Sequence, residues 1–168
     1  MYLEIYNTPR YAAKERSKPH IMESHFRCLH CGAVVYNQPV ISGVQNRNHC
    51  PFCLWSRHMD YLHPGDRMSA CKAVMQPIAL TVKQTRNKYA SHAMGELMLV
   101  HRCDDCSKLS INRIAADDQA CMIEHVFHAS LSLDVVVKDD LESAQIYPLA
   151  VDDEIMLYTQ LYGVYSPR

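Results

Sequence analysis

Three Cys-x-x-Cys pairs set among short apolar runs predict a small α+β fold of the zinc-ribbon type. In such a fold, short β-hairpins surround one or two structural zinc sites, and here a C-terminal α/β appendage follows. The pairs are Cys28 with Cys31, Cys50 with Cys53, and Cys103 with Cys106. Cys, Gly, Pro, Asn and His interrupt the apolar runs, which is typical of loop-rich ribbons with short hairpins. The chain has 168 residues, enough for one domain of ordinary size.

The sequence divides into three parts. Residues 1–25 form an N-terminal arm, in which Thr8 can cap a short helix and Pro9 suits its first position. Residues 26–118 form the predicted zinc-binding domain, where AVVY, PIALTV and ELMLVHRC are the best strand candidates. Residues 119–168 form an acidic extension.

The extension carries the longest alternating pattern in the chain. In FHASLSLDVVVK, residues 127–138, every second residue from Phe127 to Val137 is apolar, which predicts a long strand. Asp117 or Asp118 can cap a brief helix over residues 121–126 before it. After a turn at KDDLES and the run QIYPLAV, the segment DDEIMLYTQLYG predicts a short helix that ends near Gly163.

The first zinc site is predicted from two matched pairs. Cys28 with Cys31 and Cys50 with Cys53 are separated by a spacing typical of zinc ribbons, and each pair presents two thiolates to one metal. Pro51 suits the tight turn of the second pair, and Gly32 suits a left-handed exit from the first. Leu54, at the equivalent position after the second pair, is less suited to a left-handed conformation.

The second zinc site has fewer matched ligands. Cys103 and Cys106 supply two, and Cys71 is the best third. The candidates for the fourth ligand are His58, His101, His63 and Cys121. We favour His58, because the chain leaves the first ribbon at this residue and can turn toward Cys71. His101 lies on the same side of a strand as Cys103, which suits a supporting role equally well. We therefore expect two Zn²⁺ ions per chain.

The net charge of −1 conceals a polarity along the chain. Residues 1–116 carry 15 basic against 8 acidic side chains, a net charge of +7, whereas residues 117–168 carry 2 against 10, a net charge of −8. Thiolate deprotonation at two zinc sites lowers the first figure to about +4. The basic charge of residues 1–116 favours an anionic partner such as RNA. The acidic charge of residues 117–168 favours a protein partner or head-to-tail self-association.

The cysteines also bear on where the protein works. The N-terminus has no apolar stretch of signal-peptide length, and no run approaches the roughly 18 apolar residues of a membrane span. Eight cysteines in such a chain are expected to be metal ligands or redox thiols rather than a disulfide framework. We therefore expect a cytoplasmic protein with no membrane contact.

The residues just before Cys50 are candidates for binding a partner. His49 adjoins a ligand but diverges from it, so it is expected at the rim of the site rather than on the metal. Arg47 and Asn48 either brace the loop or face solvent or a partner. Together with Arg67, these three residues form the predicted partner-contacting set.

The segments RNHCPFCLWSRHMD, PGDRMSACKAVMQPI and HRCDDCSKLSINRIAADD resemble the bacterial RNHCP-domain proteins over residues 26–118. The resemblance implies a zinc-ribbon-like domain and assigns no activity. Ser107 and Ala73 stand where glycine is expected. Carried over by position, the resemblance selects Arg47, Asn48, His49, Cys50, Pro51, Cys53, His58, Asp60, Pro64, Gly65, Asp66, Arg67, Cys71, His101, Cys103, Cys106, Asn112, Asp117 and Asp118.

Three functions are weighed on these features. The leading one is a zinc-stabilised binding module that contacts RNA or a ribonucleoprotein such as the ribosome. The alternative is a structural or protein-interaction component that docks through its acidic C-terminal region. An enzyme ranks third, because a zinc held by four protein ligands has no open position for hydrolysis and zinc-bound thiolates are poor nucleophiles. A nuclease would use His49 with Asp60 or Asp66, and a thiol redox protein would use its cysteines.

Overall fold

The computed structural model describes residues 25–63, 65–83 and 95–163. A hairpin of β1 (His25–Arg27) and β2 (Val34–Tyr36) is followed by the short helix α1 (Pro39–Ser42). The strands β3 (Ser56–Arg57), β4 (Val74–Lys83), β5 (Glu96–Cys103) and β6 (Leu109–Arg113) form one antiparallel sheet in that order. The C-terminal part contains α2 (Ala120–Ser130), α3 (Val135–Ser143), the 3₁₀ turn η1 (Val151–Asp153) and α4 (Glu154–Tyr162). The α+β class predicted from the sequence is confirmed.

The three best strand candidates are strands in the structure. AVVY contains β2, PIALTV lies within β4, and ELMLVHRC is β5. Pro77 falls within β4 beyond the two residues that pair with β3, and the register with β5 shifts just after it. Proline has no N–H to donate to a ladder, so a site beside a bulge is where a strand tolerates it. The predicted N-terminal helix lies outside the described residues.

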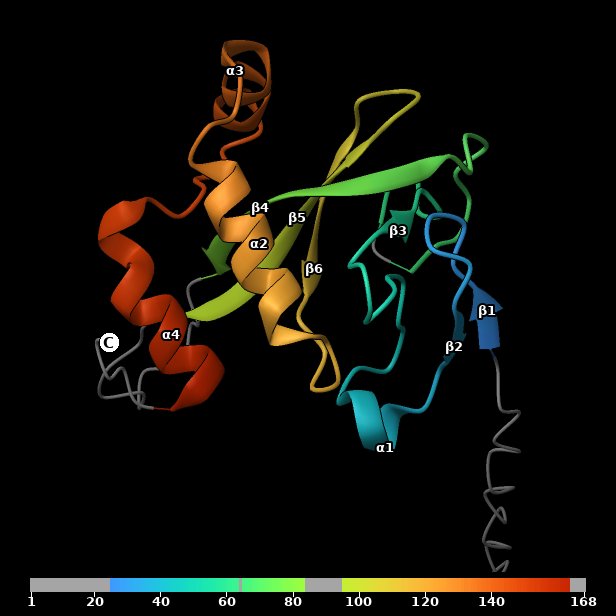
Figure 1. Cartoon of the computed structure of the whole chain (residues 1–168). Helices are drawn as coiled ribbons and strands as arrows, with labels where there is room; N and C mark the ends of the chain where they lie inside the picture. Colours follow the sequence, from blue (N-terminus) through green and yellow to red (C-terminus); the bar gives the residue numbers. More distant parts are fainter. Residues whose placement is uncertain (1–24, 64, 84–94, 164–168) are drawn as a thin grey trace, which may run out of the picture.

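The helix α2 covers one face of the four-stranded sheet (Figure 1). Its buried side chains Ile123, Val126 and Phe127 pack with Leu80 of β4 and Leu99 of β5. Leu149 and Leu157 from the C-terminal part complete this core cluster. The extension therefore shares its main core with the sheet.

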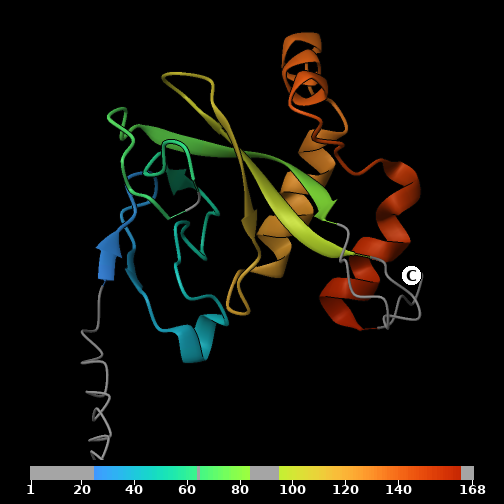
Figure 2. The same cartoon turned by 180° about the vertical axis from the view of Figure 1, so that it is seen from behind.

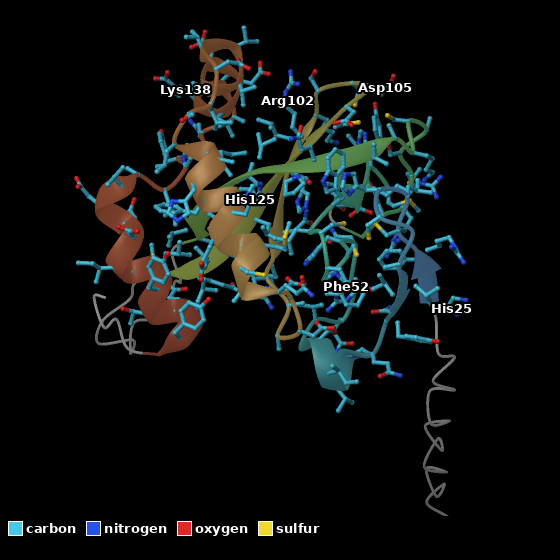
Figure 3. The ribbon with its side chains drawn as sticks, in the orientation of Figure 1. His25, Phe52, Arg102, Asp105, His125 and Lys138 are labelled. Carbon is cyan, nitrogen blue, oxygen red and sulfur yellow. The ribbon has the colours of Figure 1, made fainter. Side chains whose placement is uncertain are left out.

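A second cluster includes α3. Leu141 of α3 packs with Ala79 of β4, Val100 of β5 and Ile146. Arg102 of β5 forms an ion pair with Asp140 of α3 at 3.1 Å, and Figure 3 shows its side chain on the side of the sheet near that helix. Seen from behind, α3 projects beyond the end of α2, and α4 lies on the opposite side of the molecule from the β1–β2 hairpin (Figure 2).

The predicted strand over residues 127–138 is wrong. Residues up to Ser130 belong to α2, residues 131–134 form a turn, and α3 begins at Val135. The burial of Ile123, Val126, Phe127 and Ser130 follows the helical spacing of three and four residues instead of two. The alternation arose because two helices of different orientation meet in that stretch.

The prediction that Asp117 or Asp118 caps the helix now labelled α2 is wrong. The prediction of a last helix that ends near Gly163 is confirmed. Gln119 precedes α2 without a capping side chain, and Asp134 caps α3 by accepting a hydrogen bond from the N–H of Val137 at 2.9 Å. The segment DDEIMLYTQLYG forms η1 and α4 and ends at Gly163, which has a positive φ of 86°. This C-cap is the conformation that glycine adopts without steric cost.

Among the residues that the structure describes, no single helix is long and apolar enough to cross a membrane. The pair α2 and α3 meets the length and composition criterion only when taken together, with a bend of 103° between them.

The helical reassignment of residues 127–138 predicts unequal effects of two truncations. Phe127→Ala should lower the free energy of unfolding by about 3–5 kcal/mol, because it leaves a cavity in the core under α2. Val135→Ala should change it by no more than about 0.5 kcal/mol, because Val135 is 70% exposed at the start of α3. Urea unfolding in the presence of zinc measures both. Large losses at both positions would favour the strand.

Candidate metal centres and a buried polar network

The first predicted metal site is assembled from two loops. Cys28 and Cys31 follow β1, and Cys50 and Cys53 precede β3. The Sγ atoms of Cys28 and Cys53 are 3.6 Å apart, those of Cys31 and Cys50 are 3.7 Å apart, and all four lie within 4.8 Å of one another. Disulfide sulfur atoms are about 2.05 Å apart, so these thiols are unbridged. Four sulfurs at about 2.3 Å from a tetrahedral zinc are about 3.8 Å apart, so this arrangement fits zinc.

The second site contains the favoured set of ligands. His58, Cys71, Cys103 and Cys106 form one group within 4.8 Å. The Sγ atoms of Cys71 and Cys103 are 3.6 Å apart, and Nδ1 of His58 is 3.3 Å from Sγ of Cys106. His101, the next candidate, belongs to neither group among the described residues. With three thiolates and one imidazole, the donor set also fits zinc.

The three Cys-x-x-Cys turns share one backbone geometry. The N–H of the first cysteine donates to a carbonyl five residues on, and the residue after the second cysteine donates back to the first. These pairs are Cys28–Ala33 and Gly32–Cys28, Cys50–Trp55 and Leu54–Cys50, and Cys103–Lys108 and Ser107–Cys103, at 2.8–3.1 Å. The residue after the second cysteine has a positive φ in every turn: 75° at Gly32, 60° at Leu54 and 59° at Ser107. Ser107 thus keeps the turn that glycine was expected to make.

His58 and Cys71 repeat this geometry with a long loop between them. The N–H of His58 donates to the carbonyl of Ala73, two residues after Cys71, as the N–H of Cys28 does to Ala33. Lys72, directly after Cys71, has a positive φ of 55°. The pair is therefore a metal-binding turn whose two ligands are separated by residues 59–70. We call this segment the inserted loop.

The inserted loop is organised by two carboxylates. Asp66 accepts hydrogen bonds from the N–H groups of His63, Tyr61, Met68 and Leu62, at 2.8–3.1 Å. These bonds hold the pKa of Asp66 well below its usual range, with His63 contributing most. Asp60 accepts from the N–H groups of Gly65 and Arg67. Both carboxylates thus serve the loop's own backbone.

The buried thiols of the first site favour a bound cation. Burial raises the pKa of Cys50 to about 11 and raises that of Cys53 further. A thiolate is the metal-binding form, and a divalent ion supplies the positive charge that stabilises it. When bound at these closed sets of four protein ligands, zinc would hold the loops together and leave no position for a substrate.

A network of buried charges joins the second cysteine turn to the segment after β6. Arg47 forms an ion pair with Asp117, and its Nη1 lies 3.6 Å from a carboxylate oxygen of Asp118. His49 Nε2 lies 2.8 Å from the other oxygen of Asp118, which also accepts the N–H of Ala115. Since buried charges are costly unless they are paired, these two acids are what allow Arg47 to lie inside the protein.

A chain of side-chain hydrogen bonds links the two buried histidines, His101 and His49, through Asn112 and Asn48. His101 donates from Nε2 to the carbonyl of Leu54 at 2.7 Å, so its Nδ1 must accept from the Asn112 amide at 2.8 Å. The Asn112 oxygen then accepts from the Asn48 amide, and the Asn48 oxygen accepts from His49 Nδ1 at 3.2 Å. Nε2 of His49 faces a carboxylate oxygen of Asp118 at 2.8 Å. Burial, and next the charge of His49, lower the pKa of His101 to about 3 and keep it neutral.

The predicted partner-contacting set is corrected for two residues. Arg47 is 3% exposed and His49 is 1% exposed, so their side chains are internal braces and not an exposed rim. Asn48 is half-buried within the same network, and Arg67 is exposed in the inserted loop. Asn112 had no predicted role, and Asp117 or Asp118 was expected only to cap a helix, so the part that these residues play in the network was missed. The available signal was that the resemblance selects all three together with Arg47 and His49.

Paired cysteine turns with closed Cys₄ and Cys₃His sets, set beside an antiparallel sheet, define a metal-binding module of the zinc-ribbon type. The sequence model of the RNHCP domain matches residues 23–123, well over half of the chain, so the protein belongs to the RNHCP family. A search of curated proteins and a search of solved structures each found no match.

The ligand assignment predicts a selective loss of metal. His58→Ala should reduce the zinc content from two ions per chain to one, because it removes a ligand of the second group alone. His58→Cys should retain both ions, since a thiolate can replace the imidazole. Metal analysis of the purified protein measures this. His63→Ala, in the same loop, is the control and should keep both ions, and a loss at His63 instead would contradict the assignment.

The charge network predicts a large cost for removing one carboxylate. Asp118→Ala should lower the free energy of unfolding by about 3–5 kcal/mol, because it leaves buried His49 and the N–H of Ala115 without their acceptor and leaves Arg47 with Asp117 alone. Urea unfolding followed by the fluorescence of Trp55 measures it. Asp139→Ala on exposed α3 is the control and should have little effect. A loss at Asp118 below about 1 kcal/mol would mean that the network contributes little stability.

Proposed function

We propose that this protein is a zinc-stabilised binding module that contacts RNA, free or within a ribonucleoprotein. The observation that carries the proposal is the distribution of ion pairs among the arginines. Of the six arginines in the described residues, Arg47, Arg102 and Arg113 form ion pairs with carboxylates, whereas Arg27, Arg57 and Arg67 do not. These last three line a single cavity.

Two lysines extend this group of arginines. Lys72 donates to the carbonyl of Arg67 at 3.0 Å, and Arg57 donates to the carbonyl of Lys72 at 2.9 Å. Lys108 lies with its Nζ 5.5 Å from the centre of the Tyr61 ring and lines a neighbouring cavity together with Arg57. We call Arg27, Arg57, Arg67, Lys72 and Lys108 the cationic group. Arginine binds phosphate with paired N–H donors, and aromatic rings beside it stack on unpaired bases.

The arrangement of the candidate catalytic groups disfavours the nuclease. His49 is buried against Asp118, while Asp60 and Asp66 accept backbone hydrogen bonds inside the inserted loop. A hydrolytic site needs these groups together beside a metal with an open position. Both ligand sets here are complete with four protein side chains.

The C-terminal extension supports the second candidate function, docking on a protein. Val135 and Val136 are exposed at the start of α3, which also carries the acidic residues Asp139 and Glu142. An apolar pair beside acids suits a basic protein partner. The RNA proposal remains the leading one because its cationic group converges on one place.

RNA binding predicts a definite salt dependence. Filter binding of a single-stranded RNA should show the logarithm of the association constant falling with that of salt concentration, with a slope of about −2 for three phosphate contacts. Arginine and lysine contacts release counterions from the strand, and this release is the physical reason. Absence of any salt-dependent binding would overturn the proposal. Capture of a basic protein through α3, abolished by Val135→Asp, would then favour the second candidate.

A further inference from the structure

We propose that the cavity between the first cysteine turn and the inserted loop binds one nucleotide of a single-stranded RNA. Its base would occupy the cavity, and its phosphate would lie on the surrounding arginines. The inference rests on the proposed RNA-binding function and gives that function a site.

The cavity has a size and lining that suit a single-ring base. Its volume is about 150 Å³, and a cavity of roughly this size admits a single aromatic ring. Apolar walls come from Phe26 and Leu29 of the first ribbon, from Trp55, and from Met59 at the start of the inserted loop. Asn48 and Ser56 also line the cavity, with side chains that are held by hydrogen bonds within the protein. An apolar site with a few fixed polar groups is typical of small-molecule pockets.

Trp55 is held in place by its other contacts. Its ring stacks on His30 with a centroid distance of 4.1 Å and an interplanar angle of 4°. Trp55 also packs against the cluster formed by the first metal site. A ring fixed in this way loses little conformational entropy when a base stacks on it.

The arginines are positioned by bonds that leave donors free. Arg27 uses Nη1 for the carbonyl of Gly32 at 3.3 Å, and Arg57 uses Nε for the carbonyl of Lys72. Each guanidinium has five N–H donors, so most remain available for phosphate oxygens. Arg47 also lines the cavity, but its side chain is buried and paired with Asp117 and Asp118, so the available donors belong to Arg27 and Arg57.

The surroundings favour a strand over a free nucleotide. A second cavity of about 210 Å³ shares Asn48, Ser56, Arg57 and Met59 with the first. It is also lined by Lys108, Tyr61 and Asp60, whose carboxylate accepts hydrogen bonds from the backbone of the inserted loop. A strand entering the first cavity thus has a second cationic and aromatic position beside it, which a mononucleotide would leave empty.

Trp55 is the chain's only tryptophan, so its fluorescence reports directly on the cavity. Titration of the zinc-loaded full chain with a single-stranded RNA octamer should quench this fluorescence in parallel with the anisotropy change of labelled RNA. The octamer should bind at least about tenfold more tightly than AMP, because it adds further stacking and phosphate contacts. Ribose 5-phosphate should give no quenching. Equal affinity of AMP and the octamer would overturn the assignment to a strand.

Two variants test the named residues. Arg67→Gln should weaken octamer binding about tenfold more than Arg113→Gln, a matched loss of charge at an exposed arginine outside the cavity. Trp55→Leu should weaken binding by about tenfold while keeping an apolar side chain. Zinc content and circular dichroism check each fold. If Trp55→Leu fails to fold, the comparison of Arg67→Gln with Arg113→Gln tests the cavity assignment by itself.

The failures of the two proposals are distinguishable. Salt-dependent RNA binding without Trp55 quenching, or with equal effects of Arg67→Gln and Arg113→Gln, would overturn the cavity assignment and leave the RNA-binding function standing. Absence of binding at any salt concentration would overturn both proposals.

Discussion

The ion pairs between the second cysteine turn and the segment after β6 are the contact on which the rest of the structure depends. Arg47 brings a positive charge into the interior, where it meets Asp117 and Asp118, and His49 contacts the carboxylate of Asp118 beside it. A buried charge without its partner is strongly destabilising, so separating the two segments would cost a large free energy. His101 of β5 adds a bond to the carbonyl of Leu54 beside the same turn. The ribbon and the sheet are thereby coupled through the second cysteine turn, which carries two ligands of the first metal site.

The second metal site holds the inserted loop in place. His58 and Cys71 lie at its two ends, so one bound ion fixes both while Asp60 and Asp66 fix its interior. The loop carries Met59 and Arg67 to the cavity whose other wall is the first ribbon. The site lies beside the β5–β6 turn, where Figure 3 shows Asp105 on the far side of the molecule from α4. A metal ion bound at this site would therefore help to shape the cavity.

The sequence predicted which cysteine and histidine side chains would lie together, because the spacing within each Cys-x-x-Cys pair is a local property. A Cys-x-x-Cys turn defines its own backbone, and even the second site needed only a choice among four candidates for one position. The alternation over residues 127–138 misled because period-two spacing also arises where a helix ends, turns and restarts at Asp134. The burial of Arg47 could not be predicted because its partner Asp117 lies 70 residues further along the chain. Only a tertiary contact brings the two together.

The internal role of the RNH motif changes where recognition is expected. Arg47, Asn48 and His49 use their hydrogen-bonding groups mostly on one another and on partners from β6 and beyond. A group already paired in the interior cannot also select a ligand without breaking that pairing, which would cost several kcal/mol. The proposed RNA contact therefore relies on neighbouring side chains that are not paired within this network. Trp55 and Arg57 follow the second cysteine turn directly, so the ion pairs that fix that turn also position the two side chains proposed to meet an RNA base and its phosphate.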